Sequence, residues 1–478
     1  MDHDLPSRRR RLLILGICSM SLLIVGLDTT IVNVALPSIH AALHATLPEL
    51  QWVIDAYTLV LASLLMLAGS TADRIGRRRT FQAGLVVFSL ASLLCALAPS
   101  IELLLAARVL QAVGGSMLNP VAMSIIRNVF EDPRERAQAI GVWGGMFGLS
   151  LALGPIVGGA LVDSVGWRAV FLVNIPVGIV AIALTAAFVP ESRAARPRRF
   201  DPVGQLLVVT ALATLTYAII EGPGKGWGSA EILSLFAFSA VCFATLIWYE
   251  RRREEPLLEM KFFRSVPFSG ATAIAICVFA AIGGFLFLNT LYLQDVRHLS
   301  PLHAGLYLLP MAIMVLIFAP LSGRLVGRRG ARPSLVAAAV AMIVAALMLT
   351  RINPGTPAPY LLAAYFMFGL GAGLVNPPIT NTAVSGMPPA QAGVASAVAS
   401  TSRQVGISLG VAVLGAVAGG SISSTLGRGF AAATHSAWWI VVGLGVAVLI
   451  LGVLTTTEWA AETALRKRSP TSYSPLTP

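Results

Sequence analysis

Fourteen long apolar runs, separated by short polar or charged segments, dominate this sequence. A helix needs about 20 apolar residues to cross a bilayer, and most of these runs approach or exceed that length. Backbone groups cannot stay unpaired in lipid, so each run is expected to be an α-helix. Only 12% of the residues are charged, against about 25% in soluble domains. The sequence therefore predicts an all-α integral membrane protein. The expected spans are residues 12–36, 50–72, 80–98, 101–125, 137–162, 168–189, 203–220, 231–249, 267–291, 303–323, 333–350, 358–381, 391–418 and 435–456.

Lys and Arg residues lie mostly on one side of these spans. Of the 34, 27 fall in segments on the side of the N-terminus, 5 fall in segments on the other side, and Arg108 and Arg403 lie inside spans. Positively charged loops tend to stay in the cytoplasm. Both termini are therefore expected there, as a segment over 1–11 and a tail over 457–478.

The chain also contains an internal echo. The segment 69–79 follows the second span and ends in arginines, and 323–332 does the same after the tenth span, 254 positions later. Gln138 to Gly141 and Gln391 to Gly393 repeat with an offset of 253. A shift of eight spans predicts a six-helix bundle over 12–190, a linker over 191–264 with two extra spans, and a second bundle over 265–456. The two extra spans flank a turn-rich segment, 221–228, that is expected to be a loop. Duplicated bundles are typical of secondary transporters.

The first copy of the echo resembles the G-x-L-A-D-R-x-G-R-R signature of the major facilitator superfamily, with Thr71 in place of the usual Leu. We interpret it as a cytoplasmic latch whose charge pairs form and break as the halves close and part. The alternative is a row of arginines that only anchors the spans. The second copy has Gly327 in the position of Asp73, so the latch is expected to be asymmetric. The predicted gate residues are Gly69, Asp73, Arg74, Gly76, Arg77 and Arg78.

Three further stretches narrow the resemblance. Residues 27–37, 108–115 and 154–159 look like those of the fourteen-span drug:proton antiporters, relatives of the EmrB and QacA exporters, although Ala112 replaces a usual Gly. Segments 52–57 and 402–406 are also similar to that family. The resemblance implies a monomeric exporter in a bacterial cytoplasmic membrane that works by alternating access. A proton gradient would drive it without a cofactor. The predicted antiporter motif is Gly154, Pro155, Gly158 and Gly159, for which generic helix packing is the alternative.

Ionised groups inside spans are the other candidates. A charged carboxylate there costs at least ~2.5 kcal/mol, so Asp28 is predicted to be functional. The alternative is a structural carboxyl bonded to neighbours such as Thr29 or Asn33. Asp55 lies near the outer end of its span and either acts in transport or reaches water. The resemblance associates Arg108 with proton coupling, and the alternative is that it ties helices together. For Arg403 two roles are equally supported: it lines the cavity, or it holds neighbouring helices together. The candidate set for proton coupling or the substrate cavity is Asp28, Asn33, Asp55, Arg108 and Arg403.

Other classes of protein find little support. The chain has no H-E-x-x-H or Walker motif, so no metal site is expected. It has no basic domain with aromatic residues between the charges, so no nucleic-acid partner is expected. A G-x-S-x-G match at 406–410 allows an intramembrane hydrolase, but no strand precedes it. An importer or a metabolite exporter of the same fold stays open. The expected partners are protons, the lipid bilayer and a small hydrophobic drug or antibiotic, for which a cationic charge is permitted but not required.

Overall fold

The computed structural model describes residues 7–194, 200–253, 256, 259–384, 392–419 and 428–465. The regular structure in these ranges is helical, and it contains 14 segments long and apolar enough to cross a membrane. This confirms the predicted number of spans. The spans are α1 (Arg8–Leu43), α2 (Leu47–Ile75), α3 (Arg77–Leu97), α4 with α5 (Ile101–Ser116, Asn119–Val129), α6 (Pro133–Ser164), α7 with α8 (Ala169–Leu172, Asn174–Phe188), α9 (Pro202–Lys225), α10 (Ala230–Glu250), α11 with η2 (Val266–Leu291, Tyr292–Val296), α13 (Leu309–Arg329), α14 (Arg332–Leu349), α15 (Ala358–Val384), α16 (Ala392–Gly419) and α17 (Arg428–Leu454). The short helices are η1 (Phe262–Arg264), α12 (Pro301–Tyr307) and α18 (Glu458–Leu465).

Local sequence explains many helix starts. In α2, Thr46 and Glu49 form a capping box, in which the Glu49 carboxylate accepts the Thr46 N–H at 2.6 Å. Ser300 caps α12 through its side chain, with its hydroxyl accepting the His303 N–H. Proline, which needs no N–H partner in the first turn, occupies that turn in many of the helices. These are α2, α5, α6, α9, α11, α12, α13 and α14.

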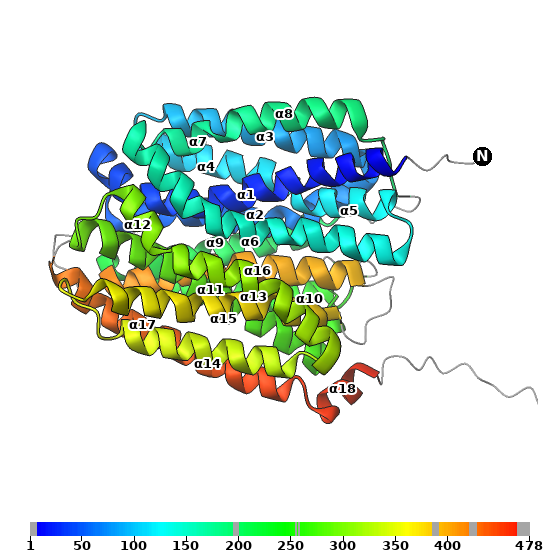
Figure 1. Ribbon diagram of the computed structural model, residues 1–478. Coiled ribbons are helices and arrows are strands. Elements are labelled where there is room, and N and C mark those ends of the chain that lie inside the picture. The colour runs from blue at the N-terminus through cyan, green and yellow to red at the C-terminus, as the bar shows by residue number, and fades with distance from the viewer. Residues whose placement is uncertain are drawn as a thin grey trace, which may run out of the picture.

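The helices pack in two groups with α9 between them. In Figure 1, α1 to α8 fill the upper part of the molecule, and α13 to α15 with α17 fill the lower part. Within the first group α1 packs on α6 and α2 on α4, and within the second α11 packs on α16 and α15 on both α13 and α14. Helix α9 pairs with α10 and also contacts α2 and α16, one helix from each group. Helix α9, one of the two extra spans of the linker, therefore lies where the two groups of helices meet.

The two groups are joined firmly at the end of the bundle that carries α12, which we call the closed seam. Asp163 of α6 accepts hydrogen bonds from the Ser300 hydroxyl at 2.9 Å and the Leu302 N–H at 3.0 Å. Gln294 donates to the Val34 carbonyl at 2.9 Å. A single apolar cluster also includes residues from helices of both groups. Side-chain amides and carboxylates thus bond the backbone of the opposite group across the closed seam.

Two segments differ from their predicted form. The turn-rich stretch 221–228 is mostly helical, because α9 continues through Pro223 to Lys225. Gly222 has no side chain, and the Trp227 ring folds back to within 2.6 Å of where a Cβ would lie, which holds the helix end against its own loop. The first copy of the echo is mostly the end of α2 rather than a loop, and Gly76 alone links α2 to α3 at φ +127°. Only glycine adopts that backbone conformation readily.

Candidate functional site

A buried ion pair lies inside the first group of helices. Arg108 of α4 places Nη1 2.5 Å from Oδ2 of Asp28 on α1, and the two side chains are 1% and 0% exposed. The Arg108 Nε donates to the Val53 carbonyl at 3.0 Å, and the guanidinium stacks over the Tyr57 ring at 4.2 Å. The sequence marked both charges as candidates, and the structure brings them into direct contact.

Three amide and hydroxyl side chains complete this network. Gln111 and Asn174 each donate to Oδ1 of Asp28, at 2.8 and 3.0 Å, and Gln111 also donates to the Ser92 hydroxyl at 2.9 Å. Donors from α4 and α8 therefore offset the cost of burying the carboxylate. Sequence reasoning missed these three residues. Gln111 could have been found, because it lies one turn after Arg108 on the same helix face, but neither Ser92 nor Asn174 carries such a signal.

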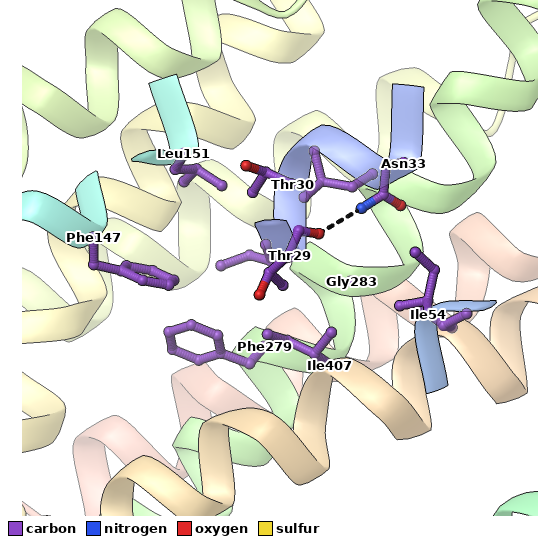
Figure 2. Close-up of a pocket in the computed structure, with 12 residues that line it drawn as sticks. Thr29, Thr30, Asn33, Ile54, Phe147, Leu151, Phe279, Gly283 and Ile407 are labelled. Atoms are coloured by element: carbon purple, nitrogen blue, oxygen red, sulfur yellow. Dashed lines mark hydrogen bonds between the residues drawn. The ribbon is translucent and has the colours of Figure 1, made fainter. Parts of the chain in front are cut away.

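A cavity lies between the two groups of helices, next to this network. Its lining comes from both groups and is mainly apolar. Figure 2 shows the Phe147 and Phe279 rings on facing sides, with their centroids 6.1 Å apart. Thr29, Thr30 and Asn33 of α1 supply the polar part. The full lining is Thr29, Thr30, Asn33, Ile54, Phe147, Leu151, Phe279, Ile282, Gly283, Leu286, Ile407 and Val411.

Asp28 and Asn33 face different surroundings. Asn33 lines the cavity as the candidate set allowed, and its amide donates to the Thr29 carbonyl at 3.0 Å. Asp28 is absent from the lining, because its carboxylate turns toward α4 and α8. In the described chain Asp28 is bonded to Arg108, Gln111 and Asn174 and not to Thr29 or Asn33, and these bonds suit a structural carboxyl as well as a functional one. The two sites are nevertheless adjacent, because Thr29 follows Asp28 directly.

Asp55 of α2 is fully buried where α2 meets α16, so the alternative that it reaches water is wrong. The Thr58 hydroxyl donates to its Oδ1 at 3.4 Å, and Ser408 of α16 lies beside it. Ser408 is the central residue of the G-x-S-x-G match. The flanking Gly406 and Gly410 lie against the backbone of α11, so this pattern provides close helix packing and not a nucleophile turn.

The predicted gate residues lie where α2 meets α3. Asp73 forms an ion pair with Arg77 at 3.1 Å, one helical turn away. Glu191, beyond α8, accepts the N–H groups of Arg78 and Arg79 at 3.1 and 3.3 Å and so caps α3. A carboxylate at a helix N-terminus is stabilising. Sequence reasoning missed Glu191, although it is an acidic residue directly after the sixth span.

The two gate glycines are used differently. Gly76 makes the turn between α2 and α3. A Cβ at Gly69 would meet Pro120 at an ordinary 3.8 Å, so Gly69 makes no close helix approach to the described residues in this conformation. Arg74 lies exposed in the last turn of α2.

The antiporter motif forms two tight contacts along α6. A Cβ at Gly158 would lie 2.7 Å from Cγ1 of Ile31, and Gly154 lies as close to Thr30, so α1 and α6 pack backbone to backbone. A Cβ at Gly159 would lie 2.6 Å from Cα of Leu302, at the start of α12. Pro155, in turn, presents its carbonyl to Gly305 of α12. The motif therefore builds part of the closed seam, and packing and function are not exclusive here.

Comparison with known proteins identifies the family to which the chain is similar. The model of the Major Facilitator Superfamily matches residues 18–411. The chain is 38% identical to the multidrug resistance protein Stp of Mycobacterium tuberculosis, over 87% of this chain and 78% of that protein. It is 37% identical to the tetracenomycin C resistance and export protein of Streptomyces glaucescens, over 83% and 74%. It is 35% identical to the multidrug efflux pump LfrA of Mycolicibacterium smegmatis, over 84% and 80%.

Solved structures agree on the fold. A bacterial homologue of the human lysosomal transporter Spinster, in an inward-facing and unoccupied conformation, superposes with a TM-score of 0.66 at 19% identity and covers 98% of this chain and 100% of its own. A bacterial homologue of the human drug peptide transporters PepT1 and PepT2 gives 0.67 at 15% identity, over 96% and 100%.

Proposed function

Because this chain belongs to the major facilitator superfamily, as a multi-pass membrane transporter and not an enzyme, we propose that it exports hydrophobic drug-like or antibiotic molecules in exchange for protons. Its relatives are named for multidrug resistance, for resistance to and export of an antibiotic, and for drug efflux. We place it in the cytoplasmic membrane of a bacterium, with the proton gradient as its only energy source. The observation that carries proton coupling is the buried pair of Asp28 and Arg108.

Asp28 is the group that takes up the proton. A proton on its carboxylate removes the negative charge that Arg108 faces at 2.5 Å. An unpaired buried charge is strongly unfavourable, and the guanidinium cannot lose its own proton, so α1 and α4 must rearrange. Because Thr29, Thr30 and Asn33 of α1 line the cavity, that rearrangement changes the substrate site. The proton and the substrate thus act on the same helix from opposite faces.

Alternating access then follows from movement between the groups of helices. We propose that residues 12–190 and 265–456 move as two bundles, with both termini and the Asp73 ion pair in the cytoplasm. The closed seam, with Asp163 and Ser300, faces the outside. In the reverse state the seam opens and the latch formed by Asp73 and its arginines binds the second bundle. Asp55, buried where α2 meets α16, lies on the surface that must part.

The test is transport by the purified protein in proteoliposomes with an imposed pH gradient. An antiporter accumulates a radiolabelled hydrophobic drug on the acidic side, whichever way the molecules are inserted. A proton-coupled importer of the same fold would accumulate its substrate on the alkaline side. Transport toward the acidic side that collapses with a protonophore supports the proposal. Accumulation on the alkaline side, or transport indifferent to the gradient, would refute it.

A further inference from the structure

The second arginine inside the spans has no carboxylate partner among the residues that the structure describes. Arg403 of α16 is partly buried, and none of the ion pairs formed in the described ranges includes it. Its Nη2 donates to the hydroxyl of Thr380 on α15 at 2.7 Å, and its Cζ lies 5.9 Å from the centre of the Phe279 ring. Its Nε is buried without a hydrogen-bond partner in the part of the chain that the structure describes. The guanidinium is therefore under-satisfied as well as unpaired.

The position of Arg403 connects it to the cavity. It precedes Ile407 by one helical turn, so the two side chains lie on the same face of α16, and Ile407 lines the cavity. Phe279, which the guanidinium approaches, lines the cavity too and packs against Phe147 there (Figure 2). Arg403 thus adjoins the apolar space between the two groups of helices.

The two intramembrane arginines differ in charge balance. Arg108 is neutralised by Asp28, so that network brings no net charge to the centre of the protein. Arg403 leaves a positive charge there, and a charge inside a membrane span is costly and is therefore a candidate for function. A tie between α15 and α16 through one hydroxyl would need only a neutral donor. Arginine has five N–H donors in a planar fork that suits a carboxylate.

We propose that Arg403 binds the anionic group of the transported molecule, so that the substrate is a hydrophobic organic acid. This inference rests on the proposed export function and names its substrate class. The apolar body lies in the cavity that Phe147 and Phe279 line, and the carboxylate is bound by the guanidinium one turn along α16. A cationic drug is disfavoured there, because it would face a like charge.

The experiment compares matched ligands in binding to the purified protein, without any gradient. The probes are aryl carboxylic acids and their carboxamides, nalidixic acid with its amide among them, at a pH where the acids are ionised. The wild type should bind the acids about ten- to hundredfold more tightly than the amides, the ratio expected for hydrogen bonds to a charged group. Arg403→Gln should bring that ratio close to one, and Arg403→Lys should retain part of it.

Two controls separate binding from structure. Arg351→Gln removes an exposed arginine after α14 and should leave the ratio unchanged. Thr380→Val removes the one hydrogen bond to α15 and should lower the ratio less than Arg403→Gln does. Equal loss of acid and amide binding in Arg403→Gln, or a wild type that shows no preference for acids, would overturn the proposal. Failure of the export function would appear separately, as absence of pH-driven transport for every drug.

Discussion

Replacing Asp28 with Asn tests the buried ion pair first as an element of stability. The substitution keeps the size of the side chain but removes the one negative charge that Arg108 contacts in the described ranges, in a site where neither side chain is more than 1% exposed. Removing one partner of such a pair costs about 3–5 kcal/mol, because the other charge stays buried. The asparagine oxygen can also accept only part of what Arg108, Gln111 and Asn174 donate.

Arg108→Gln removes the opposite partner and should behave differently with pH. Asp28 can take up a proton to relieve its own unpaired charge, whereas an arginine cannot lose one. Acidification should therefore restore the stability of Arg108→Gln and leave that of Asp28→Asn unchanged. The double variant, without either charge, should be less destabilised than the sum of the two single variants by about 2–3 kcal/mol.

The assay is a double-mutant cycle in detergent, with unfolding followed by intrinsic fluorescence at two pH values. Expression in the membrane, measured on the same variants, controls for insertion. Purely additive effects, or an Asp28→Asn protein as stable as the wild type, would show that the pair does not carry the energy assigned to it.

Two further substitutions test the ends of the bundle. Gly159→Ala should lower the thermal midpoint and slow transport, because its Cβ would lie 2.6 Å from the backbone of Leu302 and such overpacking costs about 1–3 kcal/mol. The control Gly145→Ala, whose Cβ would have nothing within 4 Å, should change neither the midpoint nor the rate. Equal effects at both glycines would contradict the packing at the closed seam. Asp73→Asn should reduce the turnover number with little change in substrate binding. It should lower the free energy of unfolding by less than ~1 kcal/mol, since the ion pair with Arg77 is partly solvent-exposed. Weaker binding at an unchanged transport rate would exclude a latch.

The sequence was sufficient for the number of spans, because each needs only a long apolar run. Their ends were less accurate. The predicted tenth span, 303–323, is divided in the structure between α12 and α13, with a break at Leu308 before Pro310, and α13 continues to Arg329. A helix that continues beyond the lipid ends in polar residues, so the length of the apolar run does not predict where that helix ends. The same limit applies to Lys225, which the turn-rich composition assigned to a loop although α9 continues to it.

The candidate site shows a similar division. Asp28, Arg108 and Arg403 could be selected because any charge inside an apolar run is conspicuous. Their surroundings could not, since the partners lie on other helices. Asp28 and Arg108 are 80 positions apart, and nothing local to Asp55 indicates that α16 covers it. Which side chains pair across helices depends on how the bundle packs, and no repeating pattern in the sequence predicts it.

Exchange and accumulation by the Asp28→Asn variant, measured in the same proteoliposomes, test the central claim most directly. Exchange of labelled for unlabelled drug at equal pH requires a folded, alternating transporter but no proton movement. If Asp28 carries the coupled proton, the variant should retain exchange and lose accumulation driven by the pH gradient. Accumulation at the wild-type level by Asp28→Asn would contradict the assignment of the proton to this buried pair.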